Sequence, residues 1–326
     1  MKTLSRSQQR IRNRQLAEFE ALGPIPTAPQ PVGRILISAV TRTAIRGRGK
    51  VEPTDFFPTF LKRLCDLGWQ PQFVFDEDEL VEKVQDTRPV VLLNLFNEEF
   101  GAPLSVNMNI AEQLADVTFN PSRIGPIMRD KRLTNSYLTK RGIRMPEMDV
   151  KDGHTIFSNQ SSSTSKPAWL TSDLSSEDAV SRYNTRYIDT RRSFAGKEYF
   201  ITLRVLACGP HIIHGFIGAS DVSRENPSVH GVDTPRDPTL VQHLFETMFE
   251  ARYDELQRTT HQLDQIWGHG FYHHDFIIEK DTDHLYLCET GIKFDAFAFY
   301  KAMSSIADDA PCLTPLNKDV FAPKKC

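Results

Sequence analysis

HHDFII (His273–Ile278) and YLCETG (Tyr286–Gly291) are two largely apolar stretches, and each carries one carboxylate, Asp275 and Glu289. Two strand-like runs on either side of a polar turn predict a β-hairpin. Pairing across that hairpin would set the two carboxylates side by side in a cleft. Carboxylates are costly to bury unless they bind a cation, and Mg²⁺ takes one or two protein carboxylates together with nucleotide phosphates. The hairpin therefore predicts a Mg²⁺ site, with a hydrogen-bonded structural pair as the alternative.

A zinc site in the same stretch is the less favoured alternative. Three histidines lie here, His269, His273 and His274. Because His273 and His274 are neighbours in a predicted strand, their side chains point to opposite faces. They do not readily reach one metal ion, so zinc coordination is not expected.

The chain before the hairpin mixes short strands with helices, which indicates an α+β arrangement. The expected elements are a helix at Asp130–Arg141, strands at Thr155–Asn159, Asn184–Asp189, Lys197–Cys208 and His211–Ala219, and one helix from Pro238 to Trp267. The apolar residues of the last helix form a single stripe, typical of a helix that packs on a core.

The N-terminal part shows a different pattern. RILISAV (Arg34–Val40) is a nearly continuous apolar run, typical of a strand buried on both faces. Elements then alternate, with helices expected at Thr54–Leu67, Asp76–Gln85 and Val106–Asp116, and strands at Pro71–Phe75, Pro89–Phe96 and Val117–Asn120. This alternation predicts an α/β fold, with a parallel sheet covered by helices on both faces. Residues 1–31 are expected to form a charged helical arm and a proline-rich linker.

Composition excludes several classes of protein. The 326 residues carry a formal net charge of −3, so no global basic field indicates a nucleic-acid or membrane partner. No apolar run is long enough to span a membrane, and the basic N-terminal segment lacks the apolar core of a secretory signal. The five cysteines are widely spaced, which is typical of thiols in a reducing compartment. A cytoplasmic protein is expected.

A cluster of arginines, Arg42, Arg46 and Arg48, follows the first predicted strand directly. Ligands of open α/β sheets bind at the carboxyl ends of the strands, and guanidinium groups suit carboxylates. These arginines are predicted to bind an anionic substrate, and Arg224 in the polar segment before the last helix is expected to complete that pocket. The alternative is a solvated loop without a ligand.

Four phrases, in this order and spacing, resemble the ATP-grasp superfamily over roughly residues 32–300. They are NPSRI (Asn120–Ile124) with the following Asp130-Lys131, GIRMP (Gly142–Pro146), RVLACG (Arg204–Gly209) and the carboxylate hairpin. The resemblance implies a parallel-sheet N-terminal (pre-ATP-grasp) domain at 32–120. It also implies a two-subdomain α+β ATP-grasp domain at 121–326. That domain would contain a small lid subdomain at about 147–191, a metal-binding subdomain at about 192–300 and a C-terminal tail.

The resemblance also implies roles for single residues. The residues implied to bind ATP are Lys131, Lys166, Tyr187, Ile188 and Asp189. Asp275 and Glu289 would hold Mg²⁺. Arg204 would stabilise the transferred phosphoryl group, and Lys293 would contact phosphate or substrate. Two positions depart from the family pattern: Gly291 stands where an asparagine metal ligand is usual, and the strand around Ser158 lacks the usual second lysine.

The function that the resemblance implies is an ATP- and Mg²⁺-dependent carboxylate–amine ligase. It would form an amide or peptide bond through an acyl phosphate, with ADP as product, in amino-acid, peptide or specialised-metabolite biosynthesis. The expected partners are a small carboxylic acid, an amine and a second copy of the chain in a homodimer. A phosphotransferase on the same scaffold and a non-catalytic nucleotide-binding module are the alternatives.

Overall fold

The computed structural model describes residues 24–38, 56–86, 89–94, 105–150, 154–160, 169–172, 175, 181–224 and 237–292. The chain divides into two compact units. Unit 1 comprises Met1–Pro126 with Trp267–Gly270, and unit 2 comprises Ile127–Ile266 with Phe271–Cys326.

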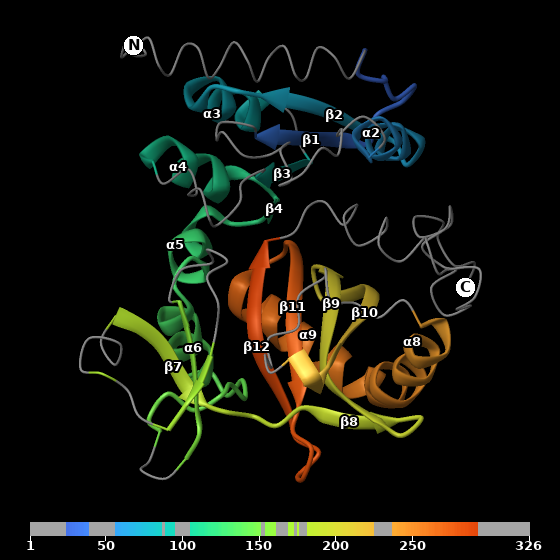
Figure 1. Cartoon of the computed structure of the whole chain (residues 1–326). Helices are drawn as coiled ribbons and strands as arrows, with labels where there is room; N and C mark the ends of the chain where they lie inside the picture. Colours follow the sequence, from blue (N-terminus) through green and yellow to red (C-terminus); the bar gives the residue numbers. More distant parts are fainter. Residues whose placement is uncertain are drawn as a thin grey trace. The chain divides into compact units, whose positions relative to one another are not determined.

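Unit 1 is built on a four-stranded parallel sheet in the order β2-β1-β3-β4 (Figure 1). Its strands are β1 (Gly33–Ser38), β2 (Trp69–Val74), β3 (Val90–Asn94) and β4 (Val117–Phe119), and its helices include α2 (Phe56–Asp66), α3 (Glu77–Asp86) and α4 (Val106–Leu114). The predicted alternation of strands and helices is confirmed, and every boundary lies within a few residues of its predicted place.

One face of this sheet carries a compact apolar core. Leu36 of β1 and Leu92 of β3 pack there with Met108 and Ala111 of α4 and with buried residues of α3. On the opposite face of β1, Ile35 and Ile37 are also buried. The first strand is therefore buried on both faces, as its unbroken apolar sequence predicts.

Unit 2 contains two antiparallel sheets. The large sheet has the order β10-β9-β11-β12, and β8 pairs with the N-terminal end of β9. The small sheet has the order β6-β5-β7. The strands are β5 (Ile156–Gln160), β6 (Trp169–Thr171), β7 (Arg182–Arg186), β8 (Arg191–Phe194), β9 (Lys197–Cys208), β10 (His211–Asp221), β11 (Phe271–Ile278) and β12 (Leu285–Ile292). The sequence did not indicate β6 or β8. The helices before the sheets are α5 (Gly125–Met128), which begins in unit 1, and α6 (Lys131–Thr139).

The prediction of one continuous helix from Pro238 to Trp267 is wrong. The structure has α8 (Pro238–Leu244), a π-helical turn (Phe245–Phe249), a 3₁₀ turn (Glu250–Arg252) and α9 (Tyr253–Trp267). Apolar periodicity does not distinguish these variants, because a wider turn still keeps its apolar side chains on the core face. The π-helical turn stacks Phe245 on Phe249, with ring centroids 4.8 Å apart.

Phe249 lies against Gly215 in β10. A Cβ atom built on Gly215 would come within 2.0 Å of the Phe249 ring, so only glycine fits at this point of the strand. We expect Gly215→Ala to lower the free energy of unfolding by about 1–3 kcal/mol, the usual cost of overpacking a core. Urea denaturation of the variant measures this change. The double variant Gly215→Ala/Phe249→Leu should recover part of the loss, and a single variant as stable as wild type would contradict this packing.

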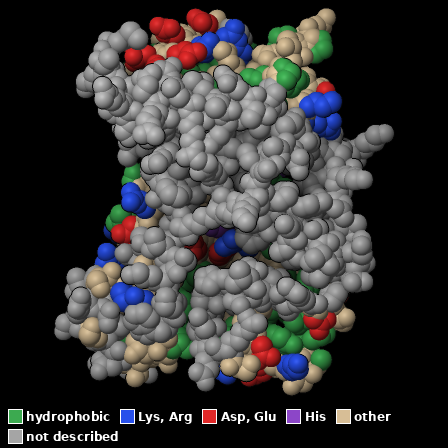
Figure 2. All heavy atoms as spheres, turned by 45° about the horizontal axis from the view of Figure 1, so that its top comes forward, with side chains coloured by type: hydrophobic (Ala, Val, Ile, Leu, Met, Phe, Trp, Pro, Cys, Tyr) green, Lys and Arg blue, Asp and Glu red, His purple; other side chains and the backbone are tan. Residues whose placement is uncertain are grey.

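Acidic and basic described side chains are both visible on the face shown in Figure 2, and neither sign covers it alone. Among the helices that the structure describes, none combines the length and the apolar character needed to cross a membrane.

Candidate active site

The candidate site lies on one face of the large sheet of unit 2, where three strands meet in register. Arg204 of β9 pairs with Asp275 of β11, and Asp275 pairs with Glu289 of β12. Side chains of directly paired residues project from the same face of a sheet. The predicted hairpin is thereby confirmed, together with the predicted side-by-side placement of its two carboxylates.

The strand β11 alternates strictly between a buried face and a less buried one. Tyr272, His274, Phe276 and Ile278 are buried, whereas His273 and Asp275 on the other face are partly exposed. His274 is fully buried, and its Nδ1 lies 2.8 Å from Thr290 Oγ1 of β12. The two neighbouring histidines thus lie on opposite faces, as the strand period predicts.

Asp275 and Arg204 form a two-pronged ion pair. Arg204 Nε donates to Asp275 Oδ1 and its terminal nitrogen donates to Oδ2, both at 2.5 Å. Burial alone would raise the pKa of Asp275, but the charge and the hydrogen bonds of Arg204 outweigh burial and lower that pKa. Asp275 therefore stays ionised, which is the form that can bind a metal ion. The sequence did not reveal that the arginine and the aspartate face each other directly.

Glu289 has a cation of its own. Lys131 Nζ lies 3.3 Å from Glu289 Oε2. Lys131 is the first residue of α6, and Asp130 caps that helix by accepting hydrogen bonds from the backbone N–H groups of Arg132 and Leu133. The Asp-Lys phrase therefore has a clear structural purpose, since the cap starts the helix where its lysine reaches the sheet.

A β-bulge lies in β12 between Leu287 and Glu289. Phe276 pairs with Leu287, so Cys288 is the extra residue. Burial raises the pKa of Cys288 to about 12, and the negative charges of Glu289 and Asp275 add to this effect. The thiol stays protonated near neutral pH, so the bulge serves geometry rather than nucleophilic chemistry.

The GIRMP segment, residues 142–146, ties α6 to both sheets. The N–H of Leu287 donates to the carbonyl of Arg144 at 2.9 Å. Asn135 of α6 donates from Nδ2 to the carbonyl of Pro146 at 2.8 Å and to the Tyr183 hydroxyl of β7 at 2.9 Å. These hydrogen bonds connect α6 and the 142–146 segment to β7 of the small sheet and to β12 of the large sheet.

The small sheet supplies a cation that the sequence analysis missed. Ser158 in β5 is fully buried, and its Oγ accepts a hydrogen bond from Arg182 Nε at 2.8 Å. Arg182 belongs to β7, the neighbouring strand. Ser158 also donates to Asn184 Oδ1 at 2.7 Å. The Arg182 guanidinium is thus bound to the strand around Ser158, where the sequence lacks the usual second lysine. Only the pairing of β5 with β7 brings the two residues together.

The segment between β7 and β8 contains Tyr187, Ile188 and Asp189, which are implied to bind ATP. The N–H of Tyr187 donates to the carbonyl of Thr155 at 2.9 Å, and the carbonyl of Asp189 accepts from the N–H of Lys280 at 2.7 Å. Ile188 between them is buried. These backbone groups already have partners, so an adenine contact here would use the remaining groups of the segment.

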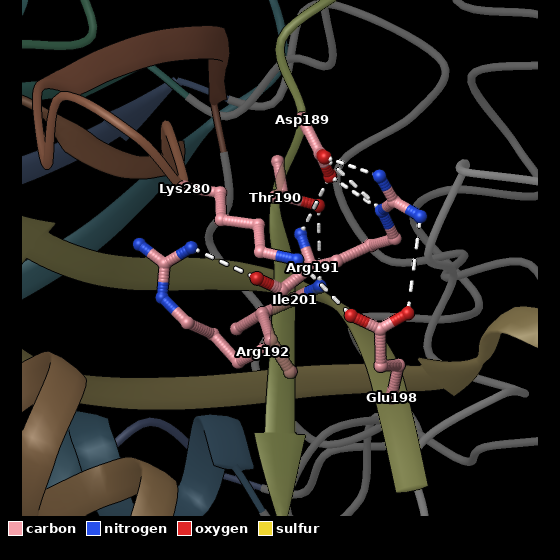
Figure 3. A network of polar contacts seen from close by, with 7 residues as sticks. All are labelled: Asp189, Thr190, Arg191, Arg192, Glu198, Ile201 and Lys280. Carbon is pink, nitrogen blue, oxygen red and sulfur yellow. Dashed lines mark hydrogen bonds and ion pairs between the residues drawn. The ribbon is translucent and has the colours of Figure 1, made fainter.

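A polar network holds this segment in place (Figure 3). Arg191 Nε and its terminal nitrogen donate to the two oxygens of Asp189 at 2.9 and 2.7 Å. Burial opposes ionisation of Asp189, but the hydrogen bonds and charge of Arg191 lower its pKa. Lys280 Nζ donates to Glu198 at 3.0 Å, which ties the β11–β12 turn to β9.

Several predicted site residues lie outside the described residues. They are Arg42, Arg46, Arg48, Lys166 and Lys293. Arg224 ends a 3₁₀ turn at Val222–Arg224, but its side chain is not described. Substrate binding by the arginines and the roles of Lys166 and Lys293 therefore remain predictions.

Searches with the sequence and with the structure gave different results. No protein-family model matches the sequence, and no curated protein sequence matches it. The structure is similar to a RimK-domain ATP-grasp protein from Sphaerobacter thermophilus, with 13% identity over 84% of this chain and 98% of that one and a TM-score of 0.42.

Two other solved structures show the same degree of similarity. One is D-alanine–D-alanine ligase from Bacillus anthracis complexed with ATP, at 12% identity over 87% of this chain and 94% of that one, with a TM-score of 0.46. The other is N5-carboxyaminoimidazole synthetase from Staphylococcus aureus complexed with ADP, at 11% identity over 85% of this chain and 74% of that one, with a TM-score of 0.47.

Proposed function

We propose that the chain is an ATP- and Mg²⁺-dependent carboxylate–amine ligase of the ATP-grasp type, which activates a carboxylic acid as an acyl phosphate. The observation that carries the proposal is a row of four charges on one sheet face. Lys131 pairs with Glu289, and Arg204 pairs with Asp275. The sequence phrases that contain these residues lie far apart along the chain, yet fold into one row. Phosphoryl transfer needs both cations for phosphate and carboxylates for Mg²⁺.

The donor set fits Mg²⁺. Asp275 and Glu289 offer carboxylate oxygens, the ligand type that a hard divalent cation prefers, and Asp275 is held ionised by Arg204. These two residues would hold the ion. When bound, Mg²⁺ neutralises charge on the nucleotide phosphates and so eases displacement at the terminal phosphorus.

The protein's own contribution to the reaction would be positioning and electrostatics. Lys131 and Arg204 would leave their carboxylate partners for phosphate oxygens, where they stabilise the charge that spreads over the transferred group. Arg182 would contact phosphate in place of the missing lysine on β5. Tyr187, Ile188 and Asp189 would line the adenine, and the network around Arg191 would keep that segment rigid. Binding both substrates in one place would let the amine attack the acyl phosphate and expel phosphate.

The first test is thermal and chemical denaturation with Mg²⁺ and ATP. At a hundred times the dissociation constant, a ligand that binds only the folded state adds about 2.7 kcal/mol to the free energy of unfolding. We expect this gain in wild type and its loss in Glu289→Gln. Asp281→Asn is the matched control, because Asp281 is an exposed carboxylate in the turn of the same hairpin. A gain that survives in Glu289→Gln would contradict the proposed nucleotide site.

The second step measures phosphate release with a panel of amino acids and dipeptides. A ligase releases phosphate only when an acid and an amine are both present. Phosphorylation of a substrate without release of phosphate would indicate the phosphotransferase instead. ATP binding without turnover across the panel would favour the nucleotide-binding module.

A further inference from the structure

A second cluster of polar groups lies in unit 1, at the carboxyl edge of its parallel sheet. Ser38 is the last residue of β1 and pairs in register with Asn94, the last residue of β3. Both side chains are almost completely buried, at 2% and 1% exposed. Neither Ser38 Oγ nor Asn94 Oδ1 has a hydrogen-bond partner among the described residues. Buried polar atoms are nearly always paired, so two unpaired ones side by side require an explanation.

Both side chains point toward α4. Leu36 and Leu92 precede Ser38 and Asn94 by two residues and pack in the core with Met108 of α4. Because side chains two residues apart in a strand share a face, Ser38 and Asn94 lie on that same face. A direct contact confirms this for Asn94, whose Nδ2 donates to Glu112 of α4 at 2.7 Å.

The orientation of the Asn94 amide follows from its neighbours. Its Nδ2 donates to Glu112 Oε1 and to the carbonyl of Asn120 at 3.2 Å. Both partners are acceptors, so they select the nitrogen, and the oxygen must point the other way. Glu112 is itself held by the N–H of Ser122 at 2.7 Å. The free position of Asn94 is therefore an acceptor, and only a hydrogen-bond donor can satisfy it.

We propose that this edge of the sheet binds the ammonium group of a small molecule between Ser38 Oγ and Asn94 Oδ1. A primary ammonium carries three donors and no acceptor, so one nitrogen can serve both oxygens at once. The Glu112 carboxylate on the far side of Asn94 polarises the amide in the direction that favours a cation. Carboxyl ends of parallel strands are also the usual ligand-binding edge of an open α/β sheet. If the proposed function holds, this ammonium belongs to the amine substrate, and that assignment alone rests on the proposed function.

The test uses the full chain without nucleotide, so its outcome does not depend on ligase activity. Methylammonium is titrated while the side-chain amide resonances of Asn94 are followed by NMR. Tetramethylammonium is the control, because it has the same charge but no donor. We expect saturable shifts of the Asn94 resonances with methylammonium only. Equal shifts with both cations would overturn the proposal, and so would no shift with either, which would leave an internal water as the partner.

Ser38→Ala tests the second oxygen. The Ser38 hydroxyl has no partner among the described residues, so its removal should leave the fold intact. We expect the variant to bind methylammonium at least fivefold more weakly than wild type does. Unchanged affinity would overturn the proposed site. The resonances of Asn135, a buried amide in unit 2, should not respond and serve as an internal reference.

Discussion

Asp275→Asn should lower the free energy of unfolding by about 2–4 kcal/mol and abolish the proposed nucleotide-dependent activity. Removing one partner of a buried ion pair leaves the other charge without compensation, at a cost of about 3–5 kcal/mol. We reduce that figure because the Arg204 side chain keeps 28% of its accessible surface. The substitution preserves the shape of residue 275, so the loss reports on charge rather than packing. Urea denaturation at neutral pH measures it.

The companion variant is Arg204→Met/Asp275→Leu. Apolar residues of similar volume often replace a buried ion pair without loss of stability, so this double variant should be at least as stable as Asp275→Asn while lacking the proposed activity. A double variant markedly less stable than Asp275→Asn would contradict this explanation. Wild-type stability of Asp275→Asn would show that the pair contributes nothing to folding.

Stability should also fall steeply in mild acid. Burial lowers the pKa of His274 to about 3 and that of His214 to about 4, whereas an unfolded histidine titrates near 6.5. The unfolded state therefore binds protons first as the pH falls. The two neutral histidines make their full contribution to the free energy of unfolding above about pH 6.5. As the pH falls below this value, that contribution is lost at about 1.4 kcal/mol per pH unit for each histidine. Between pH 6.5 and 4.5 the two together would remove about 4–5 kcal/mol.

The surroundings of the two rings support this direction. His214 packs against the rings of Phe216 and Phe245, and burial is the whole cause of its lowered pKa. Burial also dominates at His274, where the negative charge of Asp275 opposes it only in part. Asp275, Asp189 and Glu279 also have lowered pKa values, so they add further loss at still lower pH.

The measurement is the free energy of unfolding by urea at half-unit steps from pH 7 to 4.5. His214→Phe should remove one histidine's share of the slope, whatever its effect on stability at pH 7. His261→Phe is the control, because His261 is an exposed histidine of α9. A slope in His214→Phe equal to that of wild type would show that His214 is already protonated in the folded protein at these pH values.

Much of the fold could be predicted because its signals are local. The unbroken apolar run of β1 indicates a strand that is buried on both faces, and the strand period places His273 and His274 on opposite faces of β11. Asp275 and Glu289 could be paired in advance because a hairpin has only a few registers. The sequence could not reveal the bulge at Cys288, since one extra residue leaves the apolar pattern of β12 almost unchanged.

What the sequence could not supply depends on contacts between distant segments. Arg182 and Ser158 meet only because β7 pairs with β5, and nothing in either stretch indicates the other. The resemblance implies that Arg204 contacts a phosphoryl group, and in the folded chain its guanidinium is paired with Asp275. Its partner became evident only from the pairing of β9 with β11. Likewise, Ser38 and Asn94 are ordinary strand residues until the register sets them side by side.

The pairing of each carboxylate with its own cation has a consequence for how the site is filled. Lys131 with Glu289 and Arg204 with Asp275 form a set whose formal charges cancel. A divalent ion arriving alone would leave excess positive charge in a partly buried place, and a free nucleotide would leave excess negative charge. The metal–nucleotide complex carries less net charge than the free nucleotide, so it disturbs this balance less than the nucleotide alone would. If the proposed function holds, the electroneutral row therefore favours the metal–nucleotide complex over the free nucleotide.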